Sequence, residues 1–180
     1  MNLRDLLRTG TRRAQDSAEA AYRRFDLKQP ESLAGFLTAQ RLTFEAMWPV
    51  ATDPGTAAAL STAIAQIRTD MTALGHQMHG KVPPLPSADE ELAQGYVWHS
   101  TRLGVRLLAR DWQDATDANV RSAGRYLSAP RDSEGWRALC ARLEEIEGYG
   151  ALPDRVLTAA NAWFVLYETV AHDQARRLKS

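Results

Sequence analysis

Apolar residues recur along most of the chain at intervals of three and four positions, the spacing that gathers them on one face of an α-helix. Alternation of apolar and polar residues, which would indicate strands, is nearly absent. The pattern predicts helices over residues 2–25, 30–50, 54–75, 87–111, 115–128, 133–147 and 152–178. We therefore expect an all-α fold of six to seven helices that form one domain over residues 1–180.

The predicted helices are separated by short segments that contain proline and glycine. The longest of these, residues 75–90, reads GHQMHGKVPPLPSADE. Within it, Ser87 and Glu90 have the S-x-x-E spacing of a capping box, which predicts that the next helix begins at Ser87. No heptad persists for three or four repeats, so the helices are not expected to form a coiled coil.

Composition removes several classes of function. The chain has 22 basic and 22 acidic residues, whereas nucleic-acid-binding proteins usually carry a basic excess. No apolar run approaches the 18 or so residues that span a membrane, and nothing resembles a secretory signal. Cys140 is the single cysteine, so an internal disulfide is impossible. We expect a cytoplasmic protein that binds neither nucleic acid nor membranes.

The first predicted helix carries a stripe of polar residues at helical spacing. Arg8, Thr11, Gln15 and Tyr22 fall close to one line on its surface. A stripe of this kind is either a solvent-exposed face or the wall of a pocket, and both interpretations remain open.

A second candidate is the mid-chain segment GYVWHSTRLGVRLLARDW, which begins at Gly95. Gly104 lies inside the predicted helix, where glycine costs about 1 kcal/mol relative to alanine. Ser100 and Gly104 share one face, and small residues there let another helix or a planar ligand approach the backbone. His99 lines a pocket, faces solvent or bonds to a neighbouring helix. The apolar last helix contributes Phe164, either to the core or to a ligand cavity.

Motifs of established enzyme chemistry are missing from the chain. There is no catalytic serine motif, phosphate-binding loop or dinucleotide fingerprint. His76 and His79 are three residues apart, but no cysteine or carboxylate pattern completes a metal site around them. We therefore predict no metal site from spacing.

Taken in order, several short motifs resemble those of bacterial heme oxygenases, above all the biliverdin-forming type found beside bacterial phytochromes. The matching segments are Leu7-Arg8, Thr11, Glu19, Tyr22 and Phe25-Asp26-Leu27, then Phe36-Leu37, the DMTALG segment from Asp70, and YVWHSTRLG from Tyr96. The resemblance covers nearly the whole chain, including its length and helix order. It implies an all-α fold that clamps haem between the first and the mid-chain helix. The family converts haem to biliverdin, CO and iron with electrons from a reductase or ferredoxin, and a phytochrome-type partner would receive the bilin.

The resemblance assigns expected roles to the first helix and to basic residues. Gln15 stands where the family has the histidine that binds the iron, and neutral imidazole is the usual ligand for such a haem. Gln40 also replaces a histidine. Arg8 matches a position associated with a haem propionate, and Arg137 aligns with another. Phe164 matches an aromatic residue beside the haem.

On the opposite side of the implied haem, the match is partial. Ser100 takes the place of a first glycine, Gly104 is kept, and Val105 replaces the glycine that follows it. His99 stands where glutamate is common and is the nearest alternative iron ligand.

Three hypotheses follow from this combination. The first is a divergent heme oxygenase-like protein with lost or altered haem turnover that binds haem, a bilin or a partner. The second is an active heme oxygenase with an atypical residue at position 15. The third is an unrelated helical interaction domain.

Overall fold

The computed structural model describes residues 1–180 and is built from helices alone. The elements are α1 (Leu3–Gly10), α2 (Arg12–Tyr22), α3 (Pro30–Met47), the short 3-10 turn η1 (Trp48–Val50), α4 (Pro54–Leu74), α5 (Glu91–Gln113), α6 (Ala118–Ser122), α7 (Ser133–Glu144) and α8 (Ala151–Leu178). The only strand-like pairing is an isolated bridge between Asn2 and Glu147. The predicted all-α class is confirmed.

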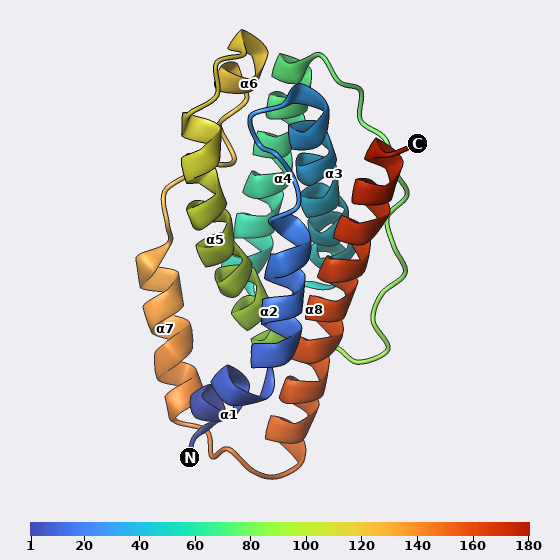
Figure 1. Ribbon diagram of the computed structural model, residues 1–180. Coiled ribbons are helices and arrows are strands. Elements are labelled where there is room, and N and C mark those ends of the chain that lie inside the picture. Colours follow the sequence, from blue (N-terminus) through green and yellow to red (C-terminus); the bar gives the residue numbers. More distant parts are fainter.

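The long helix α8 organises the bundle. It packs against α2, α3 and α5, and Figure 1 shows α2 and α5 running side by side in front with α3 and α4 behind. One contiguous cluster of 44 buried apolar residues includes members from every α-helix. Most of α3 is buried, because neighbours surround it on several sides. None of the helices combines the length and apolar character needed to span a bilayer.

The first predicted helix, 2–25, is in fact two helices that meet at Thr11. The Thr11 hydroxyl donates to the carbonyl of Leu7 at 2.6 Å, a local bond that bends helices. Gly10 permits the bend to lie against α8, because a Cβ there would stand 2.6 Å from Cδ1 of Leu157. The prediction of one continuous helix was wrong. The break results from the Thr11 bond and the close approach at Gly10, neither of which interrupts the periodicity of apolar residues.

The capping box predicted at Ser87 and Glu90 is not formed, and α5 begins at Glu91. Neither residue caps the helix with its side chain. Asp89 instead accepts hydrogen bonds from Nε2 of Gln94, at 2.8 Å, and from Nε1 of Trp163 on α8, also at 2.8 Å. These bonds tie the segment before α5 to α8 and delay the helix.

The helix predicted over 115–128 shortens to Ala118–Ser122. The carboxylate of Asp70, which is fully buried on α4, accepts hydrogen bonds from the backbone N–H groups of Arg125 and Tyr126 at 3.0 and 2.9 Å. Amides that bond to a side chain cannot continue a helical ladder. The segment after α6 is therefore fixed by α4 rather than by its own helical propensity.

Candidate functional site

A groove lies between α2 and α5, with α8 as its floor. Both helices pack on α8 but make few direct contacts with each other, and Figure 1 shows α5 leaning away from α2 toward its C-terminal end. The space between them comprises two adjoining cavities that share Gln15 and Ser100 as wall residues. We call this space the α2–α5 groove, with an apolar cavity at one end and a basic cavity at the other.

The apolar cavity has a volume of about 60 Å³ and a largely apolar lining. Its residues are Gln15, Ala18, Glu19, Tyr22, Arg23, Ser100, Thr101, Gly104, Val105, Leu107, Leu108, Phe164 and Tyr167. Phe164 and Tyr167 belong to α8, and the ring of Tyr22 stacks on that of Tyr167 with centroids 4.1 Å apart. The hydroxyl of Tyr22 donates to the carbonyl of Tyr167 at 3.1 Å. The aromatic floor is thus held rigidly.

A buried hydrogen-bonded network supports this floor from behind. Gln40 of α3 is fully buried; its amide nitrogen donates to the hydroxyl of Tyr167, and its carbonyl accepts from the hydroxyl of Tyr126 at 2.6 Å. Burial raises the pKa of both tyrosines, so both hydroxyls stay protonated; that of Tyr126 donates to Gln40 and that of Tyr167 accepts from it. Gln40 therefore links two buried tyrosines within the core and does not line either cavity of the groove.

Two pairs of residues face each other across the middle of the groove. On α2, the side-chain amide of Gln15 donates to Oε1 of Glu19 at 3.2 Å, one turn further along. On α5, a Cβ added to Gly104 would lie 3.7 Å from Cγ of Glu19, an ordinary van der Waals distance. Ser100 is 9% exposed, and its hydroxyl, which keeps some access to solvent, makes no hydrogen bond within the protein. The centre of the groove thus holds polar groups with unused bonding capacity.

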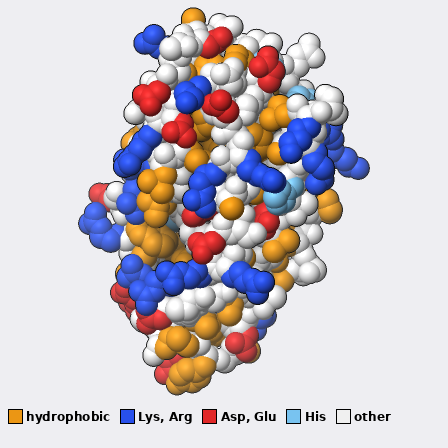
Figure 2. Space-filling view, viewed as in Figure 1, with side chains coloured by type: hydrophobic (Ala, Val, Ile, Leu, Met, Phe, Trp, Pro, Cys, Tyr) orange, Lys and Arg blue, Asp and Glu red, His pale blue; other side chains and the backbone are white.

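The basic cavity is larger, about 260 Å³. Its lining comprises Arg8, Arg12, Gln15, Asp16, Tyr96, His99, Ser100, Leu103, Arg131 and Trp136. The three arginines come from α1, α2 and the segment before α7. Figure 2 shows Lys and Arg side chains in a band across the lower part of this face, with an apolar area above it over α5. The cavity therefore suits an anionic group.

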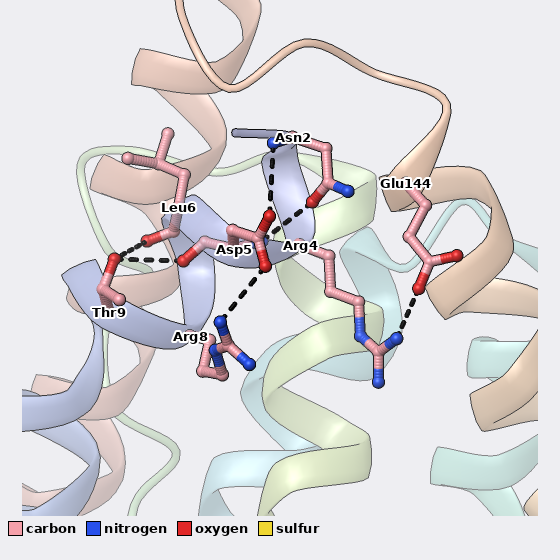
Figure 3. Close-up of polar contacts among 7 residues, drawn as sticks. All are labelled: Asn2, Arg4, Asp5, Leu6, Arg8, Thr9 and Glu144. Atoms are coloured by element: carbon pink, nitrogen blue, oxygen red, sulfur yellow. Dashed lines mark hydrogen bonds and ion pairs between the residues drawn. The ribbon is translucent and has the colours of Figure 1, made fainter.

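Of these arginines, only Arg8 has an ion pair in the protein. Figure 3 shows its guanidinium beside Asp5, at 3.2 Å, while the neighbouring Arg4 reaches Glu144 of α7. The side chain of Arg8 is 74% exposed, so its bond to Asp5 leaves most donors free. Arg12 and Arg131 form no ion pair at all.

His99 lines the basic cavity from α5, with its ring centroid 5.6 Å from that of Trp136. Burial lowers its pKa, and Arg131 acts in the same direction, while Asp132 and Asp53 oppose them. The imidazole is therefore neutral near pH 7. It lines the basic cavity and not the apolar one.

The structure brings most of the candidate residues together. Gln15, Ser100, Gly104 and Phe164 line the apolar cavity, and Arg8 and His99 line the basic one. Arg137 does not join them, because it lies exposed on α7 and lines neither cavity.

Among the groove residues that were not singled out from the sequence are two arginines and a tryptophan of the basic cavity. Arg12 stands one turn before Gln15 on α2, so helical spacing could have found it. Arg131 and Trp136 reach the groove from the start of α7 and the loop before it. No periodicity reports such a tertiary placement.

Comparison with known proteins adds no relative: no family model matches the chain, and no curated protein does. The groove must therefore be interpreted from its own geometry. Its chemistry is that of a site with an apolar, aromatic end and an arginine-rich end, joined by a few polar groups.

Proposed function

We propose that the α2–α5 groove binds a tetrapyrrole, haem or a bilin, and that the protein is a divergent heme oxygenase-like protein with lost or altered haem turnover. Tetrapyrroles of this class combine a flat apolar ring system with two carboxylates. The proposal matches the ring system to the apolar cavity and the carboxylates to the arginines of the basic cavity. The resemblance noted in the sequence supports the same ligand class.

The observation that carries the proposal is Gly104. Glycine inside a 23-residue helix costs about 1 kcal/mol relative to alanine, and a Cβ would fit here at 3.7 Å from its nearest neighbour. Helix packing therefore does not require glycine at this position. A flat ligand that lies against the backbone of α5 does require it.

The basic cavity supplies the second argument. Arginine binds carboxylates through paired N–H donors, and two of the three arginines here have no protein partner. Arg12 lies seven residues before Glu19 on α2, which at 1.5 Å per residue is about 10 Å along the helix. A ring centred near Glu19 can extend a propionate arm over that distance.

Binding also requires the groove to open. Ligand pockets for such molecules usually measure about 300–1,000 Å³, far more than the 60 Å³ of the apolar cavity. Because α2 and α5 make few contacts with each other, their separation disrupts little direct packing between them. We expect the groove to widen between α2 and α5 while Tyr22 of α2 stays stacked on Tyr167 of α8.

The residues of the groove fit the organic part of haem but not its iron. An iron ligand on α2 would come from position 15, where the amide nitrogen of Gln15 is bonded to Glu19. Amide groups are weak ligands for haem iron compared with imidazole. No other α2 residue that lines the groove is a histidine, cysteine, methionine or tyrosine, apart from Tyr22, whose hydroxyl is bonded to α8.

The second candidate function is heme oxygenase activity itself, with haem cleaved to biliverdin, CO and iron. His99 favours it, because this histidine lines the groove and its lowered pKa keeps the imidazole neutral. Only this candidate needs a reductase or ferredoxin as partner. A phytochrome-type partner suits either candidate, because both place a bilin in the groove.

Absorbance titrations with hemin and with biliverdin test the proposed ligand class. We expect saturable binding that weakens about tenfold in Arg8→Gln/Arg12→Gln, since two charge-assisted contacts with the carboxylates are removed. Arg13→Gln is the matched control, because Arg13 is exposed on α2 and lines neither cavity. Absence of binding of either ligand, or equal losses in both variants, contradicts the proposal.

Gln15→His separates the two candidate functions. In the presence of hemin and a reductant, lost turnover predicts that the natural protein forms no biliverdin, whereas the variant gains an imidazole ligand for the iron. If the natural protein produces biliverdin as fast as the variant, the enzymatic candidate replaces the first.

A further inference from the structure

The centre of the α2–α5 groove is rich in hydrogen-bond acceptors. The bond between Gln15 and Glu19 is the only side-chain hydrogen bond that either residue makes. It leaves Oε2 of Glu19 and the carbonyl oxygen of Gln15 without partners. Both oxygens accept hydrogen bonds and cannot donate them. Arg23, one turn beyond Glu19, also lines the apolar cavity but forms no ion pair with it.

We propose that the groove selects a metal-free tetrapyrrole, with the Glu19 carboxylate accepting hydrogen bonds from the ring N–H groups. This inference rests on the proposed tetrapyrrole function and names the form of the ligand. The nitrogens of a metal complex point at the metal and carry no hydrogen. The nitrogens of a bilin or a free-base porphyrin include N–H donors at the centre of the molecule.

The position of Glu19 matches this role. It is half-buried and stands opposite Gly104, where a Cβ would lie 3.7 Å from its Cγ. A ligand ring that enters when the helices separate would therefore lie between Glu19 and the α5 backbone. The amide of Gln15 fixes one carboxylate oxygen and leaves the other for the ligand. Gln15, which is a poor iron ligand, is thus a positioning residue for the carboxylate.

The opposite wall contributes a group that can bond in either sense. Ser100 is 9% exposed, its hydroxyl has no hydrogen-bond partner in the protein, and the residue lines both cavities. Placed across the groove from α2, it can donate to a ring nitrogen that carries no hydrogen or accept from one that does.

The carboxylate also changes the protonation of a bound bilin. Biliverdin has three N–H groups and one imine nitrogen, and this nitrogen takes a proton from solvent to give a cation with four N–H groups. A negative charge nearby stabilises the charged form of its partner in a half-buried site. Bound biliverdin should therefore show the red-shifted, intensified long-wavelength band of its protonated form.

Two porphyrins with the same ring and the same propionates test the preference. Protoporphyrin IX carries ring N–H groups, and nickel protoporphyrin IX has none and, with its square-planar metal, makes little demand for an axial ligand. We expect the metal-free ring to bind at least tenfold more tightly to the natural protein. Glu19→Gln, which keeps one acceptor oxygen but removes the charge, should lower this ratio and remove the red-shifted band of bound biliverdin.

The control is Asp16→Asn, a carboxylate on α2 that lines the basic cavity instead of the centre of the groove. It should leave both the ratio and the biliverdin band unchanged. Equal affinity of the natural protein for the two porphyrins, or an unchanged ratio in Glu19→Gln, overturns this inference while leaving tetrapyrrole binding intact. Failure of both porphyrins and of biliverdin to bind refutes the proposed function itself.

Discussion

Gly104→Ala is predicted to stabilise the protein while weakening its ligand binding. The added Cβ meets Cγ of Glu19 at 3.7 Å, an ordinary contact that displaces nothing. Alanine in a helix interior is favoured over glycine by about 0.5–1 kcal/mol, because an unfolded chain with alanine has less conformational freedom to lose on folding than one with glycine. The free energy of unfolding should rise by that amount.

Urea denaturation followed by circular dichroism at 222 nm measures the gain. With an m value of about 2 kcal/mol/M, the midpoint should move upward by about 0.3–0.5 M. The methyl group narrows the space over the α5 backbone, so biliverdin and porphyrin affinities should fall at least tenfold.

Gly95→Ala is the control for binding. Gly95 belongs to the same helix but its added Cβ would face Leu139 of α7, at 3.4 Å, outside the groove. Its ligand affinity should equal that of the natural protein. If Gly104→Ala is destabilised by more than about 1 kcal/mol, packing does require the glycine. If it is stabilised and binds ligand normally, the inference that a ligand lies against Gly104 fails.

Two further predictions concern the scaffold around the groove. Gln40→Leu leaves the buried hydroxyls of Tyr126 and Tyr167 without partners, at about 1–3 kcal/mol each. Urea denaturation should therefore show a loss of about 2–6 kcal/mol in the free energy of unfolding. The triple variant with both tyrosines changed to phenylalanine should recover most of this loss, and no recovery would show that the unpaired hydroxyls do not cause it. Burial lowers the pKa of His99, so unfolding takes up a proton below the ordinary value of about 6.5, and stability falls as pH drops through that region. His99→Phe should therefore lose less stability than the natural protein between pH 7.5 and 5.5. Part of the pH dependence should remain, because burial also lowers the pKa of His79. If the free energy of unfolding depends on pH equally in the variant and the natural protein, the prediction is contradicted.

Periodicity was sufficient to predict the helices because each one buries a stripe of apolar residues against a shared core. It failed where one side chain competes with the backbone. Thr11 bonds to Leu7 and divides the first helix, and Asp70 captures the amides of two residues that would have continued α6. Such contacts leave no trace in a pattern of apolar positions, because the residues involved are polar and two of the partners are far apart in sequence.

The groove shows the same division between local and tertiary information. Helical spacing alone places Ser100 with Gly104 on one face of α5, and Gln15 with Glu19 on one face of α2. It does not reveal that these two faces lie opposite each other, which depends on how both helices pack on α8. The basic cavity is harder still, since Arg131 enters it from an irregular segment, while Arg137, six residues later, lies outside.

The chemistry at position 15 connects the two levels. In the sequence, Gln15 stands where the family that this stretch resembles has an iron-binding histidine. In the folded protein its amide has a partner: it holds the carboxylate of Glu19 beside the face of Gly104. An imidazole at this position could donate to Glu19 through one ring nitrogen and bind iron through the other. It would then have no free acceptor for a ligand N–H group. Under the proposed function, glutamine at this position therefore lacks an iron ligand and offers a carbonyl acceptor for ring N–H groups, as binding of a metal-free ligand requires.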